Sequence, residues 1–161
     1  MRRLALHLPV TVVLAAVSLV GCAQALPTRG TVGRIVDGDT IELTDGRLVR
    51  YIGIDAPELR RKDAAGRWVM DPAPFAQAAT EENRRLVEGR ELRLEYDVQT
   101  HDRYGRLLAY VYVGEVMVNE ALIKAGFAHP LTIPPNVKYA DRFRALAEDA
   151  RRAHRGLWGL R

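Results

Sequence analysis

Acidic residues flank two short apolar runs in the first third of the chain, where they could bind a metal ion. Asp39 directly precedes the run TIELT, and Asp55 follows the run VRYIGI within the segment IDAPE. The Asp45-Gly46 pair between the runs is typical of a two-residue hairpin turn. Such a hairpin brings Asp39 and Asp55 to the same end of two paired strands. There, the two carboxylates and the Ala56 carbonyl could ligate a hard cation such as Ca²⁺.

Each of these acidic residues also has a simpler interpretation when it is taken singly. Asp37 fits the turn residue of an Asp-Gly pair, and Asp39 could cap a strand. Asp55 and Glu58 could be solvated residues of a turn that contains a proline. The convergence of Asp39 and Asp55 at one end of one hairpin nevertheless favours a metal site, with Glu58 beside it.

Two arginines adjoin apolar strand patterns and could bind phosphate. Arg50 lies inside the apolar run VRYIGI, where a guanidinium is costly unless it is paired or functional. Arg106 opens the run RLLAYVYV. Each could instead be an exposed charge, on a solvated sheet face for Arg50 and at a strand end for Arg106. Beside a carboxylate-bound cation, however, the two arginines would form a clamp that neutralises charge on an attacked phosphodiester.

The order of the predicted elements indicates an α+β fold dominated by a β-barrel. Runs rich in β-branched residues predict strands, longer amphipathic runs predict helices, and one charged segment with glycine and two prolines predicts a long loop. The predicted strands are 31–36, 40–44, 47–54, 91–96 and 106–113; the predicted helices are 75–90, 119–126 and 137–154; the predicted loop is 59–74. A five-stranded OB-fold barrel with three helices fits this order.

Four segments make the chain resemble the staphylococcal (thermonuclease-type) nuclease family. These segments are DGDT (37–40), VRYIGIDAPE (49–58), DRYGRLLAYVYV (102–113) and VNEAL (118–122). Their order and spacing match the family from about Thr31 to Trp158. The resemblance implies an OB-fold barrel, a bound Ca²⁺ and phosphodiesterase activity that breaks the P–O5′ bond and leaves a 3′-phosphate.

The resemblance also implies a role for individual residues. Asp39 and Asp55 correspond to the metal carboxylates, and Ala56 supplies a backbone carbonyl. Glu58 corresponds to the proposed general base, although a carboxylate near a metal could orient water instead of accepting its proton. The two phosphate-binding arginines and a tyrosine that contacts the terminal phosphate of the substrate correspond to Arg50, Arg106 and Tyr104.

The segment PLTIPPN, residues 130–136, departs from the family pattern. The prototype has two tyrosines there that pack on the nucleotide, and this chain has none. Base stacking contributes roughly 1–3 kcal/mol per base, so affinity and base preference are expected to differ from the prototype. Arg61, Lys62, Arg67 and Trp68 could compensate, or they could belong to a solvated loop with one buried tryptophan.

Residues 1–22 have the pattern of an export signal. A basic start is followed by an apolar stretch over residues 4–20. LVGC at its end resembles the bacterial lipobox with Cys22 as the lipidated residue, whereas AQA (23–25) fits ordinary signal cleavage. Cys22 is the only cysteine, so no internal disulfide can form, and a lone cysteine here favours a cell-envelope lipoprotein. A secreted or periplasmic soluble protein is the alternative.

The rest of the chain is predicted to form a tether, residues 23–30, and one domain, residues 31–161. Loss of Arg2 and Arg3 with the signal leaves 22 basic and 20 acidic residues, which is weak support for a polyanionic partner. No Ser/His/Asp set or CxxC pattern supports a serine or zinc hydrolase.

We therefore predict a monomeric, Ca²⁺-dependent nuclease acting on DNA, with RNA as a second candidate substrate, attached to a membrane if Cys22 is lipidated. The alternatives are a non-cleaving nucleic-acid-binding OB-fold module of the cell envelope and an adaptor lipoprotein. Neither alternative requires the carboxylate cluster.

Overall fold

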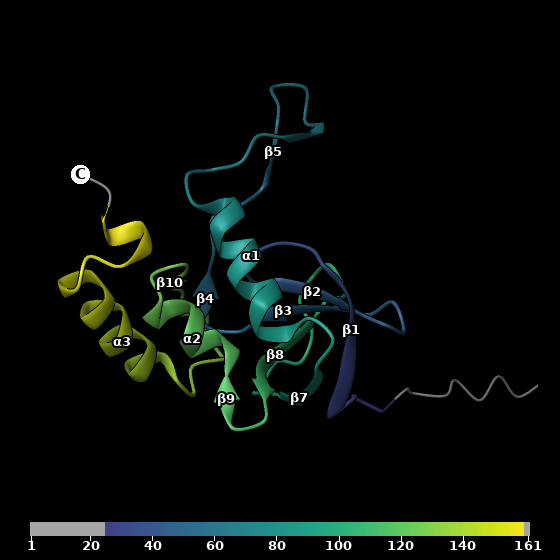
Figure 1. Ribbon diagram of the computed structural model, residues 1–161. Helices are drawn as coiled ribbons and strands as arrows, with labels where there is room; N and C mark the ends of the chain where they lie inside the picture. Colours follow the sequence, from purple (N-terminus) through teal and green to yellow (C-terminus); the bar gives the residue numbers. More distant parts are fainter. Residues whose placement is uncertain (1–24, 160–161) are drawn as a thin grey trace, which may run out of the picture.

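The computed structural model describes residues 25–159, and five of their strands close into a mixed β-barrel (Figure 1). The barrel strands and the short strand that extends the sheet are β1 (Arg29–Ile35), β2 (Thr40–Leu43), β3 (Leu48–Tyr51), β7 (Glu91–Glu95), β8 (Leu107–Val113) and β9 (Val116–Met117). Antiparallel neighbours follow the order β3-β2-β1-β7-β8, and the parallel pairing of β3 with β8 closes the barrel.

Alternate side chains of the barrel strands fill its interior, as the two-residue period of a strand requires. The buried set is Ile41, Leu43, Val49, Tyr51, Leu92, Leu94, Leu107, Ala109 and Val111. The runs that sequence alone predicts as strands therefore build one common core. This barrel and its three α-helices confirm the predicted α+β, OB-type architecture.

The helices are α1 (Ala76–Val87), α2 (Val118–Lys124) and α3 (Ala140–Arg152), followed by a 3₁₀ turn at Gly156–Gly159. Helix α1 contributes a buried Asn83, whose side chain accepts a hydrogen bond from the Tyr51 hydroxyl and donates one to the Asp37 carbonyl. These bonds fix the turn before β2 against the helix. Among the helices of residues 25–159, none is long and apolar enough to span a bilayer.

The turn at Asp45-Gly46 differs from the predicted two-residue hairpin loop. The Leu43 amide donates to the Arg47 carbonyl, so three residues form the loop between β2 and β3. Only Gly46 has positive φ, at 85°, which is the geometry of a type I turn followed by a left-handed residue. The strands still pair antiparallel, with Thr40 opposite Arg50, so the consequence for the site is unchanged.

Two further strand pairs lie outside the barrel. Strand β4 (Ile54–Asp55) pairs with β10 (His129–Pro130) beside the end of β3. Strands β5 (Arg60–Lys62) and β6 (Trp68–Met70) pair with each other in a separate hairpin. The prediction of a loop over 59–74 was therefore wrong for its middle part. The two strands have no buried face, so their sequence lacks the apolar alternation by which a strand is predicted. We call residues 60–70 the arm, which projects from the body above α1 (Figure 1).

Candidate active site

Asp39 lies at the start of β2 with its side chain only 2% exposed. One carboxylate oxygen, Oδ2, accepts the Ala56 amide at 2.7 Å and lies 3.1 Å from the Arg50 guanidinium. The other, Oδ1, accepts the Thr40 hydroxyl at 3.1 Å. Burial raises the pKa of Asp39 to about 7, against the lowering effect of the Arg50 charge. The fold therefore holds a poorly solvated carboxylate in a fixed orientation.

The Asp37-Gly38 turn explains why a second carboxylate stands so close to Asp39. Asp37 Oδ1 accepts the Asp39 amide at 3.0 Å, so Asp37 has the turn role that its sequence position predicts. A Cβ on Gly38 would lie 2.6 Å from the Ala56 Cβ and 2.9 Å from the Ala79 Cβ. Glycine thus allows the turn to pack tightly between α1 and the segment after β4.

Arg50 joins the two predicted metal carboxylates. Its Nη1 donates to the carbonyls of Tyr51 and Ile54, at 3.0 and 2.9 Å. Its Nη2 donates to Asp55 Oδ1 at 3.0 Å, while Nη1 is the atom near Asp39. The Arg50 side chain is 13% exposed, whereas that of Asp55 is 55% exposed. The structure therefore brings Asp39, Asp55 and Arg50 together at one end of β2 and β3, and the two aspartates meet there as the hairpin predicts.

Glu58 belongs to the same cluster, three residues beyond Asp55. Desolvation raises its pKa, and the nearby charge of Asp37 raises it further. Arg50, Asp55 and Arg106 also lie close enough to influence this pKa, the arginines lowering it and the aspartate raising it. Glu58 therefore reaches solvent, yet neighbouring atoms partly desolvate its carboxylate, and the charges of both arginines favour its ionised form.

Arg106 and Tyr104 belong to a tight loop, Asp102–Arg106, that precedes β8. Asp102 Oδ1 accepts the amides of Tyr104 and Arg106 at 2.9 and 3.0 Å, and its Oδ2 accepts the Arg106 Nε at 2.7 Å. Asp102 is not among the site residues predicted from the sequence. The signal that could have found it is the spacing D-x-x-G-R, in which an acid stands four residues before the candidate arginine Arg106.

A cavity of about 460 Å³ connects the two arginines. Arg50, Tyr104 and Arg106 line it, and the aliphatic side chains of Leu131 and Ile133 contribute apolar wall. The cavity can therefore accept a ligand with a phosphate at the guanidinium groups and an apolar or flat group against Leu131 and Ile133. No aromatic side chain of the Leu131–Asn136 loop is available for stacking, as predicted.

The oxygen atoms around Asp39 have the chemistry that Ca²⁺ requires. The Asp39 and Asp55 carboxylates and the Ala56 carbonyl are hard oxygen donors. Within residues 25–159, no group of three or more Asp, Glu, His or Cys side chains is arranged to hold a metal ion. Two carboxylates and one carbonyl supply fewer oxygens than the six to eight that Ca²⁺ takes, so a cation bound here would need further ligands from water or a phosphate. The proposed lipidation site, Cys22, lies outside the described residues.

Comparison with known proteins gives consistent matches. The family model described as "Staphylococcal nuclease homologue" matches residues 48–159. The thermonuclease of Staphylococcus hyicus is 37% identical over 128 residues, which cover 78% of this chain and 72% of that protein. Endonuclease YncB and the SPbeta prophage-derived endonuclease YokF, both of Bacillus subtilis (strain 168), are 37% and 38% identical over 133 residues. These alignments cover 80% of this chain but 60% and 43% of the two Bacillus proteins.

Proposed function

This chain belongs to the staphylococcal nuclease family, and on that premise we propose that it hydrolyses DNA, and RNA as a second substrate, in a Ca²⁺-dependent reaction that leaves 3′-phosphate ends. Its membership makes it a hydrolytic nuclease with a nucleic-acid substrate; the cation, the substrate preference and the products are the proposal. The observation that carries it is the position of Arg50, which contacts both Asp39 and Asp55 and lines one cavity with Arg106.

Arg50 and Arg106 are proposed to hold the scissile phosphate and stabilise its transition state. Backbone carbonyls of Tyr51 and Ile54 fix the Arg50 guanidinium, and Asp102 fixes that of Arg106. Donors that are already oriented toward developing charge need little reorganisation during the reaction. Tyr104 lines the same cavity and is proposed to contact a terminal phosphate of the substrate.

Asp39, Asp55 and the Ala56 carbonyl are proposed to hold Ca²⁺. A bound cation would supply positive charge that stabilises the phosphate oxygens in the transition state. The buried Asp39 carboxylate is suited to this role because its Thr40 and Ala56 hydrogen bonds fix its orientation. Its raised pKa shows how poorly water solvates its negative charge.

Glu58 is proposed to accept a proton from the attacking water. The water oxygen bonds to phosphorus, the P–O5′ bond breaks, and the departing O5′ takes up a proton. A general base works best when its pKa approaches the working pH, and desolvation moves the pKa of Glu58 in that direction.

The test compares the wild type, Glu58→Gln and Glu148→Gln on an end-labelled DNA strand, with Ca²⁺ or with a chelator. Glu148 is an exposed acid on α3, so its substitution gives the same charge change outside the cluster. We expect cleavage in Ca²⁺ alone, 3′-phosphate ends, and a rate for Glu58→Gln that is roughly 10²–10⁴ lower. Binding of DNA without cleavage under every divalent ion would instead support the non-cleaving binding module.

We also propose that the chain is exported and anchored through a lipid on Cys22. The support is the basic and apolar order of residues 1–20 and the LVGC segment that follows. Mass spectrometry of the mature N-terminus from a bacterial host decides between the alternatives. A lipidated N-terminal Cys22 that is lost in Cys22→Ser supports the proposal, whereas an unmodified N-terminus at Leu26 supports ordinary cleavage and a soluble protein.

A further inference from the structure

The arm is a two-stranded hairpin whose two faces differ. Residues directly opposite each other in an antiparallel pair share a face, and Lys62 lies opposite Trp68 while Arg60 lies opposite Met70. One face therefore carries two cations, an aromatic ring and a thioether; we call it the Trp68 face. The other face carries Arg61 opposite Val69.

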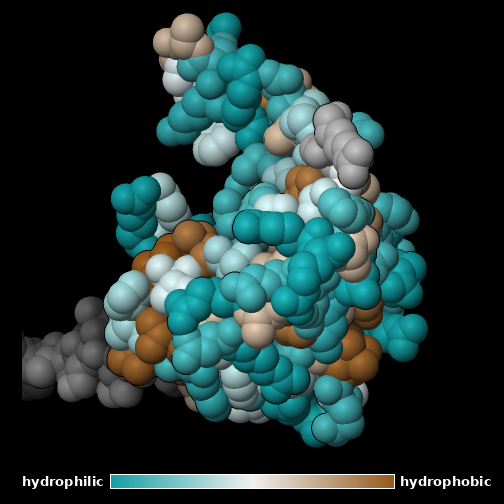
Figure 2. All heavy atoms as spheres, turned by 90° about the vertical axis from the view of Figure 1, so that its left-hand side faces the viewer, coloured by the Kyte–Doolittle hydropathy of each residue, from teal (hydrophilic) through white to brown (hydrophobic). Residues whose placement is uncertain are grey.

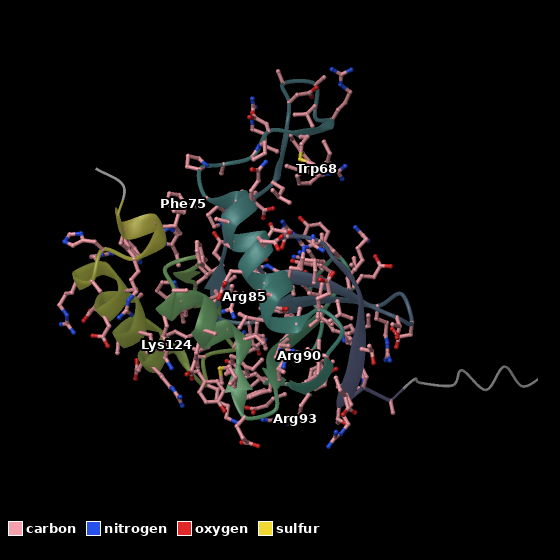
Figure 3. The ribbon with its side chains drawn as sticks, viewed as in Figure 1. Trp68, Phe75, Arg85, Arg90, Arg93 and Lys124 are labelled. Carbon is pink, nitrogen blue, oxygen red and sulfur yellow. The ribbon has the colours of Figure 1, made fainter. Side chains whose placement is uncertain are left out.

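The Trp68 face is exposed to solvent. Trp68 and Met70 are 64% and 65% exposed, although they are among the largest apolar side chains of the arm. Figure 3 shows Trp68 on the arm, outside the body of the protein, and Figure 2 shows the arm rising above the remaining surface. The expectation of a tryptophan buried in a solvated loop is thus wrong. A single hairpin is only marginally stable by itself, and an indole that packs against nothing adds little to that stability. A role in binding a ligand would explain why the tryptophan is exposed.

The cations of the arm differ in whether a carboxylate pairs with them. Arg61 is paired with Asp71, and Arg67 is paired with Asp63 at 2.8 Å. Within residues 25–159, neither Arg60 nor Lys62 forms a salt bridge, and the Lys62 ammonium lies 5.4 Å from the centroid of the Trp68 ring. The positive charges that no carboxylate neutralises therefore lie on the same face as the exposed indole.

The arm begins beside the candidate active site. The Ala73 amide donates to the Glu58 carbonyl at 3.0 Å, which closes the base of the arm next to the proposed catalytic residue. Arg60 and Lys62 are two and four residues from Glu58, and extended chain rises about 3.3 Å per residue, so the backbone of Lys62 lies within roughly 13 Å of that residue. A nucleic-acid strand cleaved at the cluster can reach it.

We propose that the Trp68 face binds the substrate as a single strand beside the cleaved phosphate, with one base stacked on Trp68 and neighbouring phosphates at Arg60 and Lys62. Exposed aromatic rings with adjacent cations are the combination that holds single-stranded nucleic acids. The face replaces the stacking that the aliphatic Leu131–Asn136 loop cannot provide. A base can stack in this way only when it is unpaired, so the enzyme prefers single strands to duplex. This inference rests on the proposed function only in taking nucleic acid as the ligand.

The direct test uses the intrinsic fluorescence of Trp68. The chain has two tryptophans, and Trp158→Phe leaves Trp68 as the sole indole. An oligo(dT) strand of about 12 nucleotides, added in the presence of chelator to prevent cleavage, is expected to quench the Trp68 emission, and a matched duplex is expected to quench it less. Unchanged emission with the single strand would overturn the inference, even if the protein cleaves DNA.

Cleavage kinetics test the same face independently. Trp68→Ala is expected to raise KM for the 12-nucleotide strand by roughly tenfold with little change in kcat. Lys62→Gln is expected to raise KM as well, whereas Arg67→Gln, with the same charge change in the salt-bridged tip loop, leaves it within about twofold. A dinucleotide offers much less strand for contact with the arm, so Trp68→Ala should affect its cleavage less than that of the 12-nucleotide strand. Equal effects of Trp68→Ala on both substrates, or equal effects of Lys62→Gln and Arg67→Gln, would refute the assignment.

Discussion

Two loops of this protein have the same local design in different surroundings. One is Asp63–Arg67, sequence DAAGR, at the tip of the arm, and the other is Asp102–Arg106, sequence DRYGR, at the candidate active site. In each loop, the aspartate Oδ1 accepts the amides two and four residues later, and its Oδ2 accepts the arginine Nε. The glycine of each loop has positive φ, at 77° and 79°.

The two arginines nevertheless end in different environments. Arg106 leads into β8, and β8 pairs with β3, so the Arg106 guanidinium comes to line a cavity with Arg50. Arg67 leads into β6, which pairs only with β5 within the described residues. The Arg106 side chain is 29% exposed and that of Arg67 is 78% exposed. The same five-residue loop is thus part of a site in one place and a plain turn in the other, according to the strand that follows it.

The sharpest test of this comparison substitutes the two arginines. Arg106→Gln is expected to lower kcat/KM by about 10²–10³, because one preoriented donor to the phosphate is lost. Arg67→Gln is expected to change kcat/KM by no more than about twofold. Both are measured on a labelled single strand at fixed ionic strength. A comparable loss of kcat/KM in the two variants would mean that lining the cavity is not what makes an arginine contribute to cleavage.

Substituting the aspartates that bind these arginines should likewise cost more activity at the site than on the arm. Asp102→Asn is expected to lower the free energy of unfolding by about 1–2 kcal/mol and kcat/KM by about tenfold, because Arg106 is no longer fixed. Asp63→Asn should leave kcat/KM unchanged. Urea unfolding and cleavage kinetics at one temperature separate the two effects. If Asp102→Asn loses stability but keeps full activity, Asp102 is structural and does not position Arg106.

Acid should weaken both loops, because the aspartate of each has a lowered pKa. Burial raises the pKa of Asp102, but hydrogen bonds from Arg106 outweigh it, and the pKa lies below the ordinary value of 3.8. Hydrogen bonds from Arg67 likewise lower the pKa of Asp63. A carboxylate with a depressed pKa contributes stability above its unfolded pKa and loses it as the pH falls through the folded pKa.

The measurement is the unfolding midpoint of the wild type minus that of Asp102→Asn, followed from pH 6 downward. The difference should be constant well above pH 3.8 and shrink below it. The corresponding difference for Asp63→Asn should be small throughout. A difference for Asp102→Asn that grows with acid would contradict the sign of its pKa shift.

The smallest expected difference between the two loops is the loss of stability when the glycine of each is replaced by alanine. A Cβ on Gly66 or Gly105 would meet nothing within 4 Å, so only the positive φ opposes a side chain. Gly105→Ala should lower the free energy of unfolding by about 1 kcal/mol. Gly66→Ala should lower it less, because the arm can open locally without unfolding the barrel. Equal losses would show that the arm and the barrel unfold as one unit.

Local sequence patterns predicted much of this protein. The alternation in TIELT and ELRLEY indicates which side chains enter the core, and glycine at a turn indicates a positive φ, because both depend on nearby residues. The convergence of Asp39 and Asp55 also followed from one hairpin and two strand lengths. The arm was missed because its first strand, Arg60–Lys62, has three cations and no apolar alternation. Asp102 was missed because its role depends on the arginine that it holds.

The sequence by itself determined the turns, the strands, the carboxylates and the arginines of this nuclease, because short-range chemistry specifies them. Only the tertiary structure decided which of these groups are buried, which are paired and which line the cavity. Closure of β3 on β8 buried Asp39, aligned Arg50 between two carboxylates and placed Arg106 in the same cavity. The loop on the arm, which has the same hydrogen-bond pattern, has no such neighbours. The physical reason is that burial and charge pairing depend on contacts between distant segments, which no five-residue pattern contains.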